Sequence, residues 1–410
     1  MSKGIKKVKK VNIKYIFFMI CLYVLIFQNL LQVYIPFFQY FDEFLSLLAI
    51  PIIIVKLFDK KIKIKVEKSN IYILVLYFVL ISTGIISFIK YRYQPFFVSF
   101  SDLLLVSKFF FAYLLSEMIF DEEFFNANKD SLSKHVKSLI IVFGGLTVLN
   151  YIFSIWPQQD YRFGIMSNRL FYTHPTYLTA ISVFLLALLI LSTDINKCKK
   201  YIIMITFVLL STLRFKAIGA ALIILFLIFY INKTNKKISV IKLGSVAIIA
   251  LMLAWGQISY YYINLDGAAR KVLNETSVKI AKDYFPIGTG FATFGSHFSA
   301  VYYSPIYYKY GISNVWGLAK GKTYFVSDTF WPMIIGQFGV IGTCSYIAIL
   351  YIIFKKIQIS YLPNKKQIYI SKIICFVYLI ICSTSESAFV SPISVPFALI
   401  LGIKMSNNDN

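Results

Sequence analysis

Apolar runs of about 20 residues follow one another along almost the whole chain, and they constrain its fold more than any other feature. A transmembrane helix needs about 20 mostly apolar residues to cross a hydrocarbon core of roughly 30 Å. Of the 410 residues, 58% are apolar and 15% are charged, whereas a soluble protein carries about 25% charged residues. The composition excludes a soluble enzyme, a secreted disulfide scaffold and a disordered chain. It predicts an all-α, polytopic membrane protein.

Hydropathy divides the chain into twelve predicted spans within a single membrane domain, residues 1–410. The spans cover about residues 14–34, 36–56, 70–89, 97–119, 137–156, 173–193, 200–213, 216–232, 239–261, 327–353, 368–385 and 388–404. No small-residue cleavage site follows the first run, so we expect it to be retained and not removed as a signal peptide. Two connections are long, residues 157–172 and 262–326, and long loops are usually functional.

The net charge of +24 predicts the orientation of the chain. Most basic residues lie in short clusters between apolar runs, such as Lys60-Lys61, Lys236-Lys237 and Lys365-Lys366. Because basic residues accumulate in cytoplasmic loops, both termini are predicted to be cytoplasmic and both long loops to lie on the outer face. This distribution argues against a nucleic-acid partner. The five cysteines show no paired spacing, so neither disulfides nor a zinc site is expected.

Basic residues and histidines also occur at the predicted outer face, where the same rule disfavours cations. They are Arg162, Arg169 and His174 around the sixth span, Arg214 and Lys216 between spans seven and eight, and Arg270 and His297 in the long loop, which ends before Ser327-Asp328-Thr329. Guanidinium groups gathered on one face suit phosphate or diphosphate, whose oxygens they bind in pairs. The pattern predicts a lipid-linked diphosphate as ligand.

Each of these residues also has a purely structural interpretation. An Arg at a membrane interface can be an anchor that places its charge in water. His174, which precedes a proline, could simply begin a helix, and Asp328 could be an N-cap. Gly288 and Gly290 could mark a turn, and the turn around Arg214 could be tight or could be a broken helix. The sequence leaves these alternatives open.

The order of the motifs resembles the O-antigen polymerase and O-antigen ligase superfamily of bacterial envelope enzymes. The resemblance covers roughly residues 140–400 and rests on YRFG followed by HP, on STLRFKA, on an Arg before PIGTGFATFG, and on Asp-Thr followed after nine residues by GVIG. In the ligases the last motif begins with His-Asn. Asp328-Thr329 stands there in this chain, which favours the polymerase (Wzy-type) branch.

The resemblance implies a membrane glycosyltransferase that polymerises oligosaccharide repeat units carried on polyprenyl diphosphate, at the outer face of the bacterial cytoplasmic membrane. The product would be O-antigen, capsule or another exopolysaccharide. The implied partners are the lipid-linked oligosaccharide, the bilayer, and a chain-length regulator and flippase of the same pathway. The leaving diphosphate would be bound by Arg214 and Arg270, supported by Arg162, Arg169, Lys216 and His174.

The acceptor sugar hydroxyl needs a base, and the sequence offers Asp328 and His297. Burial would raise the pKa of the carboxyl group, whereas His titrates near neutral pH without tuning. We prefer Asp328, because it occupies the position of the ligase His. The outer loops contain no DxD or ExD motif, so the reaction is predicted to need neither a metal nor a cofactor.

Two other functions remain as alternatives. An O-antigen ligase would transfer finished glycan to a final acceptor by the same chemistry. A flippase or transporter of lipid-linked oligosaccharide would also need cations for the diphosphate, but it would place them along a path through the spans. Lys108 is the only basic residue deep inside a predicted span, so the sequence favours the polymerase.

Overall fold

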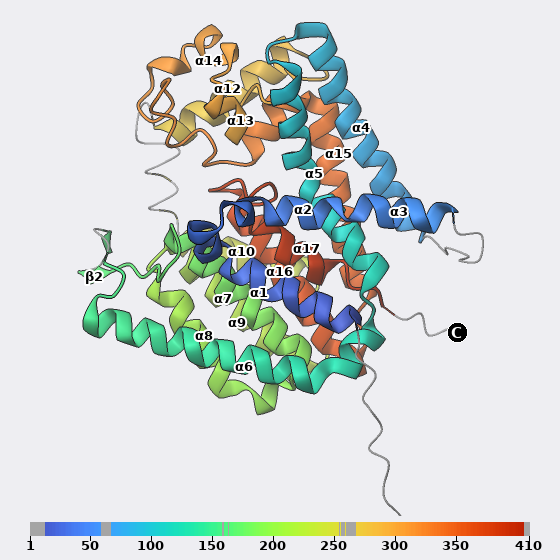
Figure 1. Cartoon of the computed structure of the whole chain (residues 1–410), viewed down its shortest axis with the longest axis vertical. Helices are drawn as coiled ribbons and strands as arrows, with labels where there is room; N and C mark the ends of the chain where they lie inside the picture. The colour runs from blue at the N-terminus through green and yellow to red at the C-terminus, as the bar shows by residue number, and fades with distance from the viewer. Residues whose placement is uncertain are drawn as a thin grey trace, which may run out of the picture.

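The fold is that of a computed structural model, which describes residues 13–58, 67–157, 160–162, 164–253 and 268–405, with the single residues 255 and 259. Its secondary structure is almost entirely helical (Figure 1). The helices are α1 (Ile13–Tyr34), α2 (Phe41–Leu47), α3 (Ala49–Phe58), α4 (Lys68–Tyr91), α5 (Phe96–Ile119), α6 (Glu122–Phe153), α7 (Pro175–Ser192), α8 (Lys199–Ser211), α9 (Phe215–Thr234), α10 (Val240–Leu253), α12 (Ala269–Asp283), α13 (His297–Val301), α14 (Pro305–Lys309), α15 (Trp331–Ile359), α16 (Lys366–Ser383) and α17 (Ser394–Leu401). The described strands, β1 (Tyr161–Arg162) and β2 (Ile165–Met166), form one short hairpin. The predicted all-α class is confirmed.

Within these described ranges, nine helical segments are long and apolar enough to cross a membrane. They are Ile13–Tyr34, Pro36–Val55, Lys68–Tyr91, Phe96–Ile119, Glu122–Phe153, Pro175–Ser192, Phe215–Thr234, Trp331–Ile359 and Pro363–Ser383. Each overlaps one of the twelve predicted spans, so the chain is a multi-pass membrane protein. Many large apolar side chains of α4, including Phe78 and Ile89, are exposed at the surface, as expected for a helix that faces lipid.

The other three predicted spans contain shorter helices. α8 has 13 residues, α17 has 8 and α10 has 14. After α10, the remainder of predicted span 239–261 lies largely outside the described residues. The segment before α17 is irregular and contains Pro392, which disfavours a helical conformation for the residue before it. Twelve spans therefore stay a prediction, as do the orientation of the chain and the placement of residues 262–326, of which 262–267 are not described.

Helix α6 begins fifteen residues before the predicted start of the fifth span. The side chain of Asp121 accepts a hydrogen bond from the amide of Phe124 at 2.8 Å, which caps the helix. Its first four turns carry many charged residues, so hydropathy alone did not reveal them. Helix formation here follows from the cap and the buried side of the helix, which includes Phe125 and Leu132.

Ion pairs join helix ends on the side opposite the cap described below. Lys356, near the end of α15, lies 2.7 Å from Glu117 near the end of α5 and 3.2 Å from Glu67 just before α4. Lys365, just before α16, lies 2.9 Å from Glu122 at the start of α6. The start of α4 and the ends of α5 and α15 therefore lie together, so α4 runs opposite to α5 and to α15.

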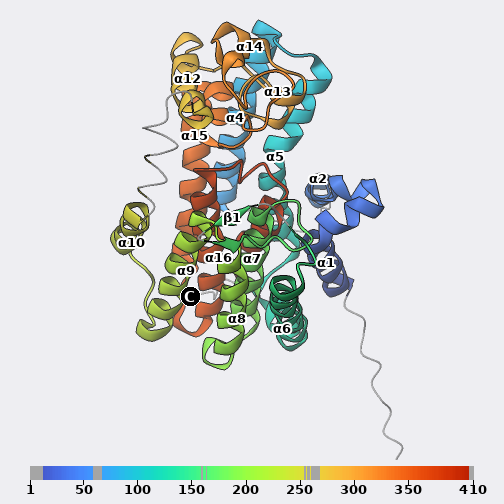
Figure 2. The same cartoon turned by 90° about the vertical axis from the view of Figure 1, so that its left-hand side faces the viewer.

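Residues 268–330, which we call the cap, fold over α4, α5 and α15 on the side opposite these ion pairs (Figures 1 and 2). The cap has a hydrophobic core of its own, separate from the core of the bundle. Its members come from every part of the segment and include Leu273, Phe294, Tyr307 and Val326. The long loop is thus a packed structure in its described part.

The motif Pro286–Gly290 connects the cap to the bundle. The amides of Thr289 and Gly290 donate to the carbonyl oxygens of Gly336 and Gln337 in α15, at 3.0 and 2.8 Å. A Cβ atom on Gly288 would lie 2.5 Å from the backbone nitrogen of Gly339, where α15 is kinked. Both glycines have positive φ angles, +72° and +61°, so the motif serves a close backbone contact.

Candidate functional site

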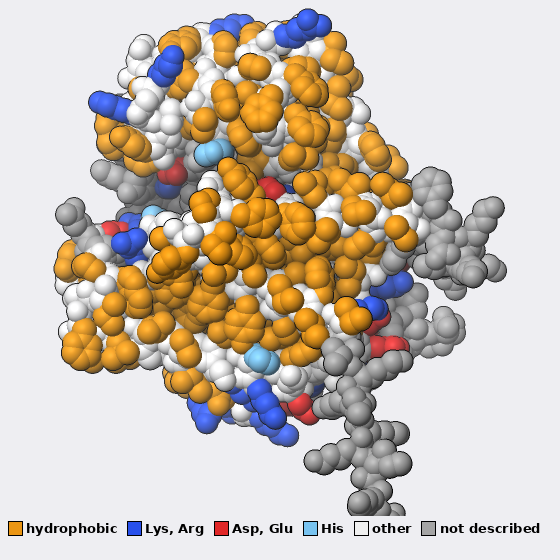
Figure 3. Space-filling model, in the orientation of Figure 1, with side chains coloured by type: hydrophobic (Ala, Val, Ile, Leu, Met, Phe, Trp, Pro, Cys, Tyr) orange, Lys and Arg blue, Asp and Glu red, His pale blue; other side chains and the backbone are white. Residues whose placement is uncertain are grey.

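Charged side chains gather between the cap and the helix bundle, where the surface is hollowed (Figure 3). We call this region the cleft. The cleft residues are Asp160, Arg162, His174, Arg214, Lys216, Arg270, Asp328 and Glu386. They come from six separate parts of the chain, and α7, α9 and α16 lie below the cap in Figure 2. Tertiary packing therefore creates the cluster.

Arg214 stands at the turn between α8 and α9. Leu213 has a φ angle of +51°, and Arg214 is the extended residue that precedes α9. Ser167 donates to the carbonyl oxygen of Thr212 at 2.7 Å, which ties this turn to the segment after the β-hairpin. The junction is thus a tight turn between two helices. An Nη atom of Arg214 lies 2.5 Å from a carboxylate oxygen of Asp160.

Asp160 also contacts Arg162, whose Nε atom lies 3.4 Å from the second carboxylate oxygen. Arg214 is 15% exposed and Asp160 is 35% exposed, so this group borders solvent. The sequence singled out both arginines but missed Asp160 as a site residue. Its only signal was an acidic residue in the predicted short outer loop.

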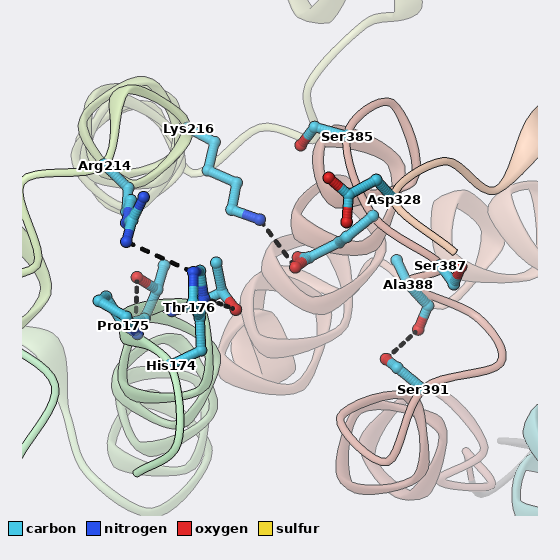
Figure 4. Close-up of polar contacts among 12 residues, drawn as sticks. His174, Pro175, Thr176, Arg214, Lys216, Asp328, Ser385, Ser387, Ala388 and Ser391 are labelled. Carbon is cyan, nitrogen blue, oxygen red and sulfur yellow. Dashed lines mark hydrogen bonds and ion pairs between the residues drawn. The ribbon is translucent and has the colours of Figure 1, made fainter. Parts of the chain in front are cut away.

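His174 is the N-cap of α7, as its structural interpretation proposed. Its Nδ1 atom accepts from the amide of Thr176 at 3.3 Å, and Arg214 donates to its Nε2 atom at 3.4 Å. Figure 4 shows His174 and Arg214 side by side. Burial, followed by the charges of Arg214 and Lys216, lowers the pKa of His174 to about 4. His174 is therefore neutral at pH 7.

Lys216 extends from the first turn of α9 toward the connection between α16 and α17 (Figure 4). Its Nζ atom lies 2.7 Å from a carboxylate oxygen of Glu386. The amide of Glu386 donates to the carbonyl oxygen of Cys382 at 2.9 Å, which fixes the backbone there. Sequence reasoning also missed Glu386. The available signal was one carboxylate in a Ser-rich stretch at the predicted outer face.

Arg270, in the first turn of α12, joins the cap to the bundle. One Nη atom lies 3.3 Å from a carboxylate oxygen of Asp328 and 3.4 Å from the carbonyl oxygen of Ser385. The hydroxyl of Ser387 donates to the carbonyl oxygen of Ser327 at 2.5 Å. The backbones that carry Asp328 and Glu386 are therefore fastened to each other at two points.

Asp328 is not the cap of α15. The helix begins at Trp331, and its N-cap is Phe330, which makes no side-chain capping bond. Burial raises the pKa of Asp328, although Arg270 and Lys216 act in the opposite direction. The capping interpretation is thus wrong, and the side chain lies instead among the charges of the cleft.

Two predicted site residues make other contacts. Arg169 donates to the carbonyl oxygen of Tyr172 at 3.0 Å, and it has no carboxylate partner among the described residues. His297 begins α13, and within the described part of the chain no hydrogen bond or ion pair connects it to the cleft. Burial and the charge of Lys108 lower its pKa.

The cleft combines four cations with three carboxylates. Neutral His174 adds no charge, so the cluster has a surplus positive charge. The helices α7 and α9 also begin here, and helix N-termini attract anions. No group of three or more His, Cys, Asp or Glu side chains in the described ranges could hold a metal ion. The arrangement is suited to an anionic ligand.

No protein-family model matches the sequence, and neither the curated proteins nor the solved structures include one that matches it.

Proposed function

We propose that the protein is a glycosyltransferase that polymerises polyprenyl-diphosphate-linked oligosaccharide repeat units at the outer face of the bacterial cytoplasmic membrane, with both of its termini in the cytoplasm. The product would be O-antigen, capsule or another exopolysaccharide. One observation carries the proposal. Arg214 and Arg270, which the family-like motifs singled out, border the same cleft although 56 positions separate them in the sequence.

The cleft can stabilise a leaving diphosphate. When the bond between the anomeric carbon and the diphosphate oxygen breaks, its electron pair stays on that oxygen. Arg214, Lys216 and Arg270 provide positive charge for this developing anion, as electrostatic catalysis requires. The N-termini of α7 and α9 add to the same field.

Asp328 is the base that the geometry supports best. Its carboxylate would accept the proton of the acceptor hydroxyl while the hydroxyl oxygen bonds to the anomeric carbon. A raised pKa makes Asp328 more basic than an ordinary aspartate. His297, the competing candidate, has a lowered pKa and no described contact with the cleft.

A flippase receives little support from the charges inside the bundle. Lys108 lies 2.7 Å from Asp42 and 2.9 Å from Glu43, and it is 1% exposed. These carboxylates already neutralise it. It therefore provides no cation for a diphosphate that crosses the membrane.

Deletion of the gene and analysis of the cell's glycans test the proposal. Loss of a polymerase leaves single repeat units, and neither Arg214→Ala nor Arg270→Ala should restore polymer at normal protein level. Lys322→Ala, which removes an exposed cap cation, should restore it. Full-length polymer that is not attached to its final acceptor would identify a ligase instead, and units retained on the inner leaflet would identify a flippase.

A further inference from the structure

Four cations of the cleft each form an ion pair with a carboxylate of the same chain. Asp160 holds Arg214 and Arg162, Glu386 holds Lys216, and Asp328 holds Arg270. The three carboxylates come from three different connections of the chain. Their side chains are 19% to 35% exposed, so the pairs are open to exchange with a ligand from the cleft.

Carboxylate and phosphate oxygens make the same charge-assisted hydrogen bonds to guanidinium and ammonium groups. An entering diphosphate can join a pair, which places two anions side by side, or it can replace the carboxylate. Like charges repel at short distance, and a side chain at a loop can turn toward water. Replacing the carboxylate by the diphosphate therefore costs less free energy than placing the diphosphate beside it.

We propose that Asp160, Glu386 and Asp328 occupy the positions of ligand oxygens in the unliganded protein and are exchanged for diphosphate oxygens when the donor binds. The inference rests on the proposed function for the identity of the ligand. It assigns the carboxylates a regulatory role, because they lower the affinity of the cleft for anions and keep its cations oriented.

The exchange has a consequence for Asp328. In the unliganded protein Arg270 and Lys216 lower the pKa of this carboxyl group, while burial and Glu386 raise it. If the diphosphate takes Arg270 and Lys216, the lowering influences weaken and a negative charge arrives nearby. Asp328, no longer paired with Arg270, is then free to accept the proton of the acceptor hydroxyl, so the donor prepares the base before the acceptor reacts.

Binding of inorganic diphosphate to the purified full-length protein tests the exchange. Asp160→Asn and Glu386→Gln should each tighten binding by about three- to fivefold, as expected for partly exposed ion pairs. Glu275→Gln is the matched control, because it makes the same change in net charge at an exposed position of α12. It should alter the affinity less than about twofold at fixed ionic strength.

Each outcome is informative. If both variants bind diphosphate no more tightly than Glu275→Gln, the carboxylates only orient the cations and the exchange is wrong, while the proposed function stands. If neither the wild-type protein nor any variant binds diphosphate, the proposed function, which requires a diphosphate ligand, is contradicted as well. Asp160→Glu keeps the charge and should stay close to the wild type, which separates exchange from disturbed folding.

Discussion

The cleft and the triad of Lys108, Asp42 and Glu43 are both built from cations and carboxylates, yet the Lys108–Asp42 pair is buried and the charge balance differs. Lys108 is 1% exposed and Asp42 is completely buried, and Gln28 donates a further hydrogen bond to Asp42 at 2.7 Å. In the cleft, the paired side chains are 15% to 35% exposed and cations outnumber carboxylates. The triad, which has one more carboxylate than cations, fastens α2 to α5 through its buried pair. The cleft is more exposed and has one more cation than carboxylates, so it can hold an anionic ligand.

The largest effect should follow from Lys108→Met. The change leaves the completely buried Asp42 and the partly exposed Glu43 without their cation, and removal of one partner from a buried ion pair costs about 3–5 kcal/mol. We expect loss of folded protein, measured as yield and thermal unfolding in detergent. A fully stable variant would show that the triad contributes no more to the stability of the folded protein than the cleft does.

The next effect concerns the base. Asp328→Asn should lower the polymerisation rate by about 10²- to 10⁴-fold, the usual contribution of a general base, with protein level unchanged. His297→Ala should retain most of the activity. An active Asp328→Asn enzyme beside an inactive His297→Ala enzyme would transfer the role to His297.

Arg214→Lys should separate charge from geometry. The variant keeps the positive charge but loses the planar pair of donors, so we expect a decrease in activity of about tenfold or more. Thermal stability should stay within the experimental error, because this ion pair borders solvent. Wild-type activity would mean that only the charge of Arg214 is required.

The pH dependence provides a smaller, graded effect. Because the pKa of Asp328 is raised, the carboxylate becomes protonated at a higher pH than an ordinary aspartate, and the rate should fall as pH decreases through that value. The sign for stability is opposite. A raised pKa in the folded state contributes stability at low pH that is lost as pH rises through the folded pKa. Rate and unfolding profiles of wild type and Asp328→Asn would check both signs.

No effect is expected from chelator. Purified enzyme with a lipid-linked donor should stay active in excess EDTA, because the cleft supplies cations of its own. Activity that EDTA abolishes and magnesium or manganese restores would show that we have misread the role of the arginines.

Sequence patterns predicted some parts of this molecule better than others. Apolar runs located nine spans, and motif order singled out Arg214, Lys216 and Arg270. Asp160 and Glu386 were missed because only tertiary contacts give them their roles. Hydropathy also predicted a full span over residues 388–404 where α17 is only 8 residues long, because buried irregular segments are as apolar as segments that face lipid.

The contact between Gly288 and Gly339 has a practical consequence for anyone who wishes to produce the cap as a soluble fragment. The cap is not an insertion that hangs from two linkers, since its segment Pro286–Gly290 lies between α4 and α15 and makes backbone hydrogen bonds to α15. Excision at residues 268 and 330 would leave those amides unpaired and uncover apolar surface. A usable fragment would have to carry the adjoining turns of both helices, with redesigned polar surfaces where lipid now lies.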